Sequence, residues 1–455
     1  MSTPYDVLVL GGGPSGSTVA NLLSAGGARV LVLEKEVFPR FHIGESLLPG
    51  ELEVFERLGV DPGRHARHMV KRGAEFYEEA RGRRAIYPFG DSLHGTPAYA
   101  YHVERSVFDA QLLSRAAEVG AEVHEGEPAR EVQLGDAEVV VKTDRADYRG
   151  RYLVDATGLD AVLGRRHRSR RRIEEFGLAA VYRHFTDLRP AVAEELARTG
   201  NIKVLFIEGG WLWAIPLGQA RLSVGLVSRK KGIADGWLDE EIARSPELSR
   251  LLDGARAEGP HQRVGSFSFH NERPHGPRWV CVGDAACFLD PVFSSGVYFA
   301  MRGASSAADA LLPALREGRE GDPALMREHS AQMTHRVQRL RDAHPGALPA
   351  APAPGPLLHR GAGLGAPAGA DHGAGRRRLA RRQPPSSSGS GRPSAAGSSS
   401  RRPLDPAQHV ALAERPRDWN NPAPVRGTGG LGVDEWSQGA RPGRVRLGPW
   451  PWNGI

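Results

Sequence analysis

The sequence feature that most constrains the fold is a glycine pattern close to the start of the chain. Gly11, Gly13 and Gly16 form a G-x-G-x-x-G motif between an apolar run at residues 5–10 and an amphipathic run at residues 16–27. Glycines at these positions permit a tight strand-to-helix turn and let backbone amides approach a pyrophosphate, an anion that a helix N-terminus favours. The motif alone is weak, but its context predicts a dinucleotide-binding βαβ unit.

Further segments follow in the order expected of a chain that binds FAD. Glu34 ends the strand predicted at residues 29–35, where a carboxylate accepts the ribose hydroxyls of adenosine; an ordinary charge at a strand end is the alternative. The VDATG segment, with Asp155 and Gly158, ends an apolar strand, and Asp284 follows a buried strand, where it suits the ribityl chain. Together these motifs resemble the flavoprotein monooxygenase superfamily and favour FAD over NAD.

The rest of the first 345 residues alternates β-rich runs with amphipathic helical runs, which is typical of an α/β protein. Runs at residues 178–185, 201–217 and 221–229 look antiparallel and half-exposed, and indicate a second, substrate-facing sheet. A buried strand at 279–288 and a long helix at 294–318 then return to the first domain. The predicted fold is a Rossmann-like FAD-binding domain of the flavoprotein monooxygenase type with an inserted antiparallel sheet. The predicted parts are 1–171 and 279–345 for the FAD-binding domain, 172–278 for the substrate-facing sheet, and 346–455 for a disordered tail.

Residues 346–455 have the composition of a chain that does not fold. The segment holds 16 of the 34 prolines and lacks Phe, Tyr, Met, Cys and Lys, so it buries too little apolar surface to offset chain entropy. It also carries 15 arginines against six acidic residues, so the net charge of +7 belongs to the tail and the preceding residues are near neutral. Two interpretations stay open: a natural low-complexity tail, or a GC-rich gene translated out of frame beyond codon 345, which resequencing would decide.

Charge, cysteine content and hydropathy exclude several classes of protein. An arginine-rich tail without interleaved aromatic residues does not fit a specific nucleic-acid site. Cys281 and Cys287 lie in one apolar run, which indicates buried thiols in a reducing compartment and neither a disulfide framework nor a metal site. No stretch of 18 apolar residues and no signal-peptide pattern occurs, so a cytoplasmic protein without membrane contact is expected.

Three shorter motifs specify a family. WLWAIP, at residues 211–216, fits the W-x-W-x-I-P signature of flavin-dependent halogenases, and FLDPVFSSG, at 288–296, fits their F-x-x-P-x-x-S-x-G signature. FPRFHIGES, at 38–46, resembles their loop beside the flavin. Residues 5–345 therefore resemble a flavin-dependent halogenase of the tryptophan-halogenase-like superfamily. The FAD site implied by these motifs comprises Gly11, Gly13, Pro14, Ser15, Gly16, Glu34, Lys35, Arg40, Glu45, Ser46, Arg105, Asp155, Gly158, Asp284, Pro291 and Gly296.

The resemblance implies a reaction in which FADH2 and O2 oxidise chloride or bromide to hypohalous acid, which travels through a tunnel to an aromatic substrate. Trp211 and Trp213 alternate along one strand and so point to the same side, where they would form a wall between flavin and substrate with Ile215 and Pro216. Plain core packing is the alternative. Arg105 matches the arginine that such proteins direct at the flavin, and a surface arginine is the alternative.

A halide site and a catalytic lysine are also implied by the resemblance. The backbone amides of Ser295 and Gly296 match the family's halide position, and a glycine-containing turn presents such amides as an anion nest. Lys71 occupies the place of the family's catalytic lysine, which is proposed to form a chloramine or to hold hypochlorous acid by hydrogen bonding. A buried lysine suits both roles, because desolvation lowers its pKa toward neutrality. A solvated surface lysine is the alternative.

Two further features of the sequence concern the substrate and the protein partners. Tryptophan halogenases carry a glutamate two residues before the halide serine, and Phe293 stands there in this chain, which favours a phenol or a pyrrole over an indole. RRHRSRRR, at residues 165–172, is interpreted either as a docking surface for an acidic acyl or peptidyl carrier protein or as a solvated turn. A separate flavin reductase is expected to supply FADH2, since no second nicotinamide-binding glycine motif is visible.

Two other functions stay open on the sequence. An FAD-dependent aromatic hydroxylase or a prenyl-type reductase would use the same glycines to deliver oxygen or hydride. A truncated, non-catalytic flavoprotein is the other alternative, because halogenases continue with helices over the substrate side of the sheet and the residues after Pro345 cannot supply them.

Overall fold

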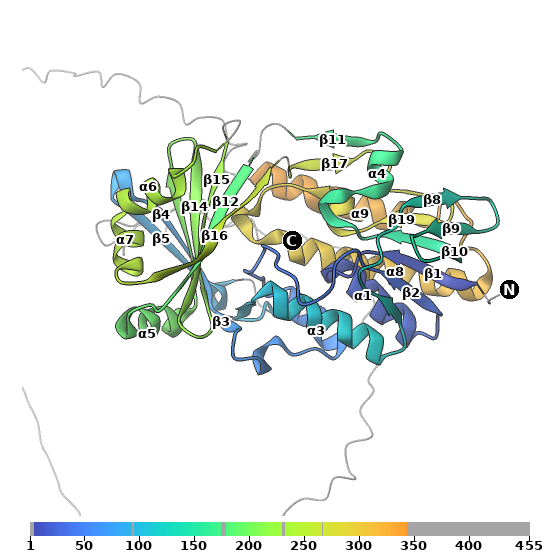
Figure 1. Cartoon of the computed structure of the whole chain (residues 1–455), viewed down its shortest axis with the longest axis horizontal. Coiled ribbons are helices and arrows are strands. Elements are labelled where there is room, and N and C mark those ends of the chain that lie inside the picture. The colour runs from blue at the N-terminus through green and yellow to red at the C-terminus, as the bar shows by residue number, and fades with distance from the viewer. Residues whose placement is uncertain (1–3, 93–94, 174–178, 230–232, 266, 344–455) are drawn as a thin grey trace, which may run out of the picture. The chain divides into compact units, whose positions relative to one another are not determined.

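The structure is a computed structural model and describes residues 4–92, 95–173, 179–229, 233–265 and 267–343. These residues belong to one unit of the chain, and Figure 1 shows how their helices and strands are arranged. The tail predicted at 346–455 lies outside the described residues. No helix of the described ranges is both long and apolar enough to cross a lipid bilayer.

The glycine motif lies between β1 (Tyr5–Leu10) and α1 (Pro14–Ala25), as predicted. β1 pairs in parallel with β2 (Val30–Leu33) and with β10 (Asp147–Asp155), and β10 pairs in parallel with β19 (Trp279–Cys281). Strands far apart in the sequence therefore share one sheet, in which β10 also pairs with a β8–β9 hairpin. The sheet is completed by β7 (Glu122–His124), β8 (Glu131–Leu134), β9 (Val139–Lys142) and β18 (His275–Gly276). Two further helices pack on it, α3 (Arg105–Glu118) and α8 (Ser295–Glu317).

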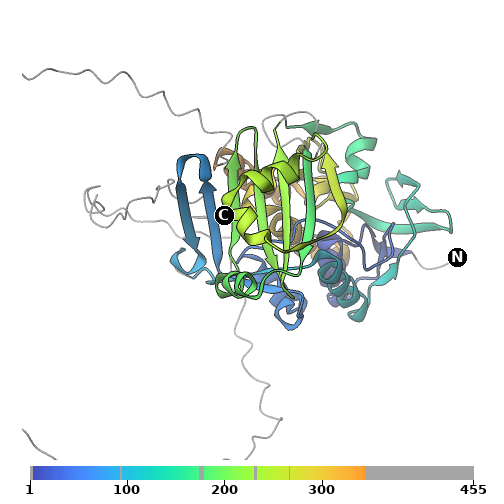
Figure 2. The same cartoon turned by 60° about the vertical axis from the view of Figure 1, so that its left-hand side comes forward.

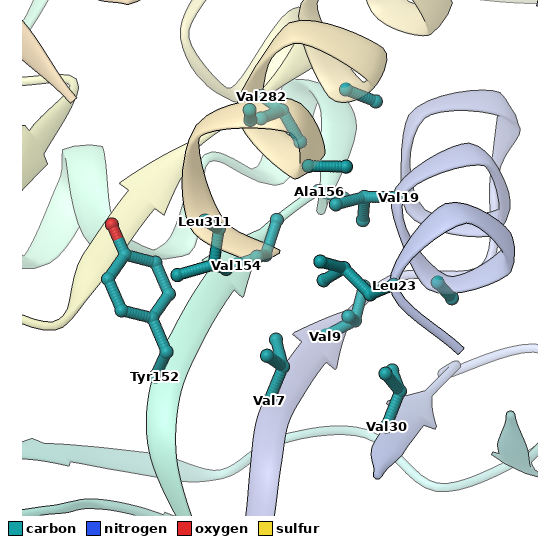
Figure 3. Close-up of a cluster of buried hydrophobic side chains, with 14 of the residues drawn as sticks. Val7, Val9, Val19, Leu23, Val30, Tyr152, Val154, Ala156, Val282 and Leu311 are labelled. Carbon is teal, nitrogen blue, oxygen red and sulfur yellow. The ribbon is translucent and has the colours of Figure 1, made fainter. Parts of the chain in front are cut away.

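Apolar side chains cover both faces of this first sheet. Val9 points to the face that α1, α3 and α8 cover, and there it belongs to one buried cluster with Val19 and Leu311 (Figure 3). The alternation of the strand sends Leu8 to the opposite face, which packs against β8 and β9. Because α8 comes from the segment that follows the second sheet, the chain leaves the nucleotide-binding part and returns to it, as the sequence predicts.

The second sheet has seven strands, and Figure 2 shows β4 and β5 in blue beside the green strands. Its strands are β4 (Gly73–Glu78), β5 (Arg83–Pro88), β12 (Ala179–Thr186), β13 (Ile202–Ile207), β14 (Gly210–Leu217), β15 (Arg221–Ser228) and β16 (Arg256–Gly265). They lie in the order β16-β12-β15-β14-β13-β4-β5, and every pair is antiparallel except β13 with β4. Residues 73–88 fall within the predicted FAD-binding part, 1–171. They join this sheet instead because β4 pairs with β13, which lies far along the chain. Local sequence patterns do not predict such a long-range pairing.

The strands β12 to β15 are buried on both faces, so the expectation of half-exposed strands is wrong for them, whereas the edge strands β5 and β16 are largely exposed. Along β14, Leu212 and Ala214 face the cluster made with three helices, while Trp211 and Trp213 face the opposite side. That opposite side is covered by residues from the return segment, such as Phe293. The three helices, visible beside the sheet in Figure 1, are α5 (Pro190–Thr199), α6 (Trp237–Arg244) and α7 (Pro246–Leu252).

Small elements connect the two sheets. β3 (Met69–Lys71) pairs with β6 (Ala100–His102), and a three-stranded sheet has the order β11-β17-β20. Its strands are β11 (Arg170–Arg172), β17 (Phe269–Asn271) and β20 (Cys287–Phe288). The remaining α-helices of the described ranges are α2 (Glu51–Leu58), α4 (Val162–Arg166) and α9 (Arg327–Ala343).

Candidate active site

A cavity of about 390 Å³ extends from the glycine loop after β1 to the tryptophan face of β14. Most of the site residues predicted from the sequence line it, although they come from both sheets and from the return segment. Those lining it are Gly11, Gly13, Pro14, Ser15, Glu34, Lys35, Arg40, Glu45, Ser46, Arg105, Gly158, Trp211, Trp213, Ile215, Asp284, Pro291 and Gly296. The predicted residues that do not line it are Gly16, Lys71, Asp155, Pro216 and Ser295.

The three glycines have different roles in the loop. A Cβ atom on Gly16 would lie 1.9 Å from the Gly11 carbonyl oxygen, and one on Gly11 would lie 2.5 Å from the Ala156 carbonyl oxygen. A Cβ atom on Gly13 would face the cavity, with Arg40 Nη2 as its nearest neighbour at 3.4 Å. α1 has no acidic residue in its first turn and no side-chain cap, so its first amides can bind an anion. This cradle fits the pyrophosphate of FAD.

Two predicted carboxylates hold the backbone around the cradle. Glu34 Oε2 accepts a hydrogen bond from the Gly12 N–H at 2.6 Å, so this side chain both lines the cavity and fixes the glycine loop. Asp155 is fully buried and accepts hydrogen bonds from the Leu163 N–H at 2.7 Å and the Thr157 hydroxyl at 2.6 Å. Burial raises the pKa of Asp155, against the opposing effect of these donors. Asp155 therefore shapes the turn after β10 from behind the cavity wall.

Arg105, at the start of α3, is buried and is not a surface arginine. Its guanidinium forms a bidentate pair with Asp109 at 2.7 and 2.8 Å and donates to the Ile43 carbonyl of the 38–46 loop. Burial raises the pKa of Asp284, which lines the same cavity, to about 7, and the charge of Arg105 opposes that rise. At neutral pH the Asp284 carboxyl can thus donate or accept a hydrogen bond, which suits ribityl hydroxyls. Asp109 was not predicted as a site residue. Its spacing of four residues from Arg105 on one helix is the sequence signal that could have identified this ion pair.

The 38–46 loop contacts both sheets. Phe41 stacks on Tyr182 of β12, with ring centroids 5.9 Å apart, and Glu45 Oε1 lies 3.0 Å from His184 Nε2. Burial lowers the pKa of His184, and the Glu45 carboxylate raises it by more, so the net shift is upward. A second cavity, of about 190 Å³, borders the same loop and shares Phe41, His42, Glu45 and Arg105 with the first. Residues of the loop therefore line both cavities.

Trp211 and Trp213 form an apolar wall of the first cavity. Their ring centroids are 5.8 Å apart, and both rings also belong to the buried cluster on this face of the sheet, so they pack in the core and line the cavity at once. Trp213 Nε1 donates to Ser223 Oγ at 3.2 Å. Trp211 Nε1 has no hydrogen-bond partner among the described residues. A buried N–H without a partner is costly, so this indole suits a ligand that accepts a hydrogen bond.

The N-terminus of α8 reaches the same cavity. Ser294 and Gly296 line it, and Ser295 is buried at the first helical position. The left-handed residue of the turn is Ser294, with φ of 58°, and a Cβ atom on Gly296 would lie 3.0 Å from a Phe288 ring carbon. Gly296 is therefore required for space and not for the turn. Because the first turn of α8 has no acidic residue, its amides face no competing carboxylate from that turn.

Lys71 is 1% exposed and lies directly behind Ser46, which lines the cavity. Its Nζ donates to Ser46 Oγ at 2.8 Å and to the Leu47 carbonyl at 2.9 Å, and it lies 5.2 Å from the centroid of the Phe89 ring. Burial lowers the pKa of Lys71 to about 7, against the opposing charge of Glu51. The solvated-lysine alternative is wrong: the amine is buried and is linked to the cavity through the Ser46 hydroxyl.

The fold and this cavity are typical of a flavoprotein, with a dinucleotide cradle that opens into a cavity with an apolar wall. The sequence also matches the family model for tryptophan halogenase over residues 6–97 and 91–344. The chain therefore belongs to the tryptophan halogenase family, whose members among its relatives are named as flavin-dependent halogenases.

Individual relatives agree with this assignment. A pyrrole-2-carbonyl peptidyl-carrier-protein chlorinase from Pseudomonas fluorescens is 29% identical over 343 residues, which are 69% of this chain and 76% of that protein. The corresponding brominase from Pseudoalteromonas luteoviolacea is 34% identical over 334 residues, or 68% of this chain and 78% of that protein. The crystal structure of CmlS, a flavin-dependent halogenase, matches with a TM-score of 0.67 at 30% identity and covers 74% of this chain and 63% of CmlS.

Proposed function

We propose that this chain is an FADH2- and O2-dependent halogenase that chlorinates or brominates an electron-rich aromatic substrate, such as a phenol or a pyrrole, in secondary-metabolite biosynthesis. The substrate is free or tethered to an acyl or peptidyl carrier protein, and a separate cytoplasmic reductase supplies the reduced flavin. One observation carries the proposal: a buried lysine lies behind a cavity that joins a dinucleotide cradle to a wall of two indoles.

Each part of the chain has a separate task in this proposal. The amides of α1 and the Glu34 side chain hold the nucleotide, and Asp284 and Arg105 lie near the ribityl and flavin portion. The amides at the start of α8 bind the halide, where helix polarity favours an anion. When bound, reduced flavin would supply two electrons that reduce O2 to the peroxide level, and peroxide-level oxygen is the two-electron oxidant that converts halide into hypohalous acid. Trp211 and Trp213 keep the aromatic substrate away from the flavin, so that only the oxidised halide crosses.

Lys71 then delivers the halogen. In one route the neutral amine attacks hypochlorous acid: an N–Cl bond forms, the O–Cl bond breaks, and hydroxide leaves with an amine proton as water. The arene next takes the chlorine, the N–Cl bond breaks, and the ring proton returns to the nitrogen. In the other route the ammonium holds hypochlorous acid and protonates its departing oxygen. The pKa of Lys71, which burial lowers to about 7, keeps both protonation states accessible near neutral pH.

A product analysis distinguishes halogenation from the nearest alternative, an FAD-dependent hydroxylase. With chemically reduced FAD, O2, bromide and a panel of phenols and pyrroles, we expect a brominated product that disappears when bromide is omitted. Mass spectrometry identifies bromine by its isotope pattern. A hydroxylated product formed in the presence of bromide would contradict the proposal and favour the hydroxylase.

We also propose that the arginine run at 165–172 docks the acidic carrier protein. Its members at 165, 166, 168, 171 and 172 are exposed, and they lie on α4, on the turn that follows it and on β11, an edge strand of the three-stranded sheet. Arg171 pairs with Glu272 at 2.9 Å, whereas Arg165 and Arg166 form no ion pair with other residues of the described ranges. A cluster of exposed positive charges accelerates association with an acidic partner.

Charge reversal tests this docking surface. Replacing Arg165 and Arg166 together by glutamate is expected to lower kcat/KM for a carrier-tethered substrate by about tenfold at low salt, and by less at high salt. Turnover of a free substrate should not change. The matched control reverses Arg130 and Arg149, which are exposed and paired with Asp144 and Glu138 on another part of the surface. Equal losses in the two double variants would contradict the docking proposal.

A further inference from the structure

Glu51 is a buried carboxylate that the proposed reaction does not yet use. It is the first residue of α2 and is fully buried. Its Oε2 accepts a hydrogen bond from the Leu48 N–H at 2.9 Å, while Oε1 has no hydrogen-bond partner among the described residues. A buried carboxyl group with so few donors is costly as an anion unless a positive charge lies near it.

The nearby positive charge is Lys71, and one peptide group connects the two side chains. Lys71 Nζ donates to the Leu47 carbonyl oxygen at 2.9 Å, and the N–H of the same peptide group, on Leu48, donates to Glu51 Oε2. A donor on the oxygen and an acceptor on the N–H polarise an amide in the same direction, so each hydrogen bond strengthens the other. The ammonium and the carboxylate are therefore coupled through this amide.

The other groups around the pair are neutral or apolar. The Phe89 ring and the Ser46 hydroxyl contact the lysine side. From β6, His102 donates through Nε2 to the Gly200 carbonyl at 2.6 Å; burial, together with the charge of Lys71, holds its pKa well below the usual value. From α8, Tyr298 packs against Gly50, and burial raises the pKa of its phenol. Glu51 is thus the charged side chain that acts on Lys71 within the described residues.

We propose that Glu51 is the proton partner of Lys71, and that the two side chains share one proton. When the proton is on Glu51, both groups are neutral and the amine is free to attack hypohalous acid. When it is on Lys71, an ion pair forms and the ammonium can hold and protonate the oxidant. The two forms differ only in which side chain holds the proton, so the net charge of the pair is the same in both, and the intervening amide couples the two charges without itself carrying the proton. Glu51 is a positioning residue in this scheme, because it acts through the amine.

The expected titration agrees with this arrangement. Burial lowers the pKa of Lys71 to about 7 and raises the pKa of Glu51 to about 8, and each charge opposes the shift of the other. Two groups with neighbouring pKa values that interact this closely titrate as a unit. The inference takes its chemical meaning from the proposed function, but its test does not depend on halogenation.

The test is the titration of Lys71 in the protein without flavin, followed by NMR with lysine labelled with 13C at Cε. The chain has six lysines, and the Lys71 signal is identified by its loss in Lys71→Met. In Glu51→Gln, which keeps the shape and removes the charge, the Lys71 midpoint should fall by about one pH unit or more, because the ammonium loses its counter-charge. The matched control is Glu53→Gln, two residues along the same helix, whose exposed carboxylate pairs with Arg302 at 3.1 Å.

An unchanged midpoint in Glu51→Gln, or a shift equal to that of Glu53→Gln, would overturn the inference. A second measurement covers the case in which Glu51→Gln does not fold. In the unchanged protein, glutamate labelled with 13C at Cδ should show a Glu51 signal with an inflection at the Lys71 midpoint, since the coupling is reciprocal. A Glu51 signal without that inflection also overturns the inference. If the titrations of Lys71 and Glu51 are independent but the protein halogenates, the role of Glu51 is rejected and the proposed function stands. If the two titrations are coupled but no halogenated product forms, the proposed function is rejected and the coupling stands.

Discussion

Lys71→Met is expected to reduce halogenated product by about a thousandfold, within the range found when a group that transfers a proton or attacks the substrate is removed. Methionine fills most of the space of the lysine and leaves the apolar contact with Phe89, but it supplies no amine. The Glu51 carboxyl then loses its counter-charge and should remain protonated at neutral pH, so the fold is retained. Product formation is measured by mass spectrometry with reduced FAD, O2 and bromide.

FAD binding and a surface lysine are the controls for this experiment. FAD should still bind, because Lys71 does not line the cavity, and its absorbance spectrum and dissociation constant check this point. Lys142→Met, on β9, removes a partly exposed lysine that pairs with Glu131 at 3.1 Å, and it should leave product formation unchanged. If Lys71→Met binds FAD and still halogenates within a few-fold of the unchanged protein, the assigned role of the amine is refuted.

Gly16→Ala and Gly13→Ala are expected to have different effects, although both residues belong to one motif. The new Cβ atom of Gly16→Ala would lie 1.9 Å from the Gly11 carbonyl oxygen, so α1 must move away from β1. We expect this shift to lower the free energy of unfolding by about 3 kcal/mol, at the upper end of the usual overpacking cost. Chemical denaturation followed by circular dichroism measures the loss.

The Cβ atom of Gly13→Ala would instead project toward the cavity, with its nearest protein neighbour at 3.4 Å. The free energy of unfolding without ligand should change by less than about 0.5 kcal/mol. The dissociation constant for FAD should rise by about 10- to 100-fold, because the pyrophosphate can no longer approach the backbone closely. Equal losses of stability in the two variants would contradict the separate roles of these glycines.

The parts of the fold predicted correctly are those that local patterns encode. The strand, glycine turn and helix at the start of the chain follow from adjacent residues, and the return of α8 follows from its long amphipathic run. The alternation along β14 also placed Trp211 and Trp213 on one face. By contrast, the pairing of β4 with β13 depends on residues far apart in the sequence, so the edge of the second sheet was not predicted.

The candidate site shows the same division. Motifs located most of the residues that line the cavity, because each motif carries its own backbone geometry. The partners of those residues were missed: Asp109 beside Arg105, His184 beside Glu45, and Glu51 beside Lys71. Most charged residues are exposed, so the sequence alone favours a surface position for each of these side chains. Only the tertiary structure shows which of them are buried and therefore need a partner.

The return of the chain to its first sheet has a consequence for synthesis on the ribosome. The cluster between α1 and β1 is completed by residues of α8, such as Ala304 and Leu311, which emerge after the whole second sheet. A nascent chain that has reached only the second sheet therefore lacks the side chains that cover the valines of β1. The cavity likewise takes Gly296, Val297 and Ala300 from the start of α8, so a complete flavin site can form only after the whole second sheet has been translated.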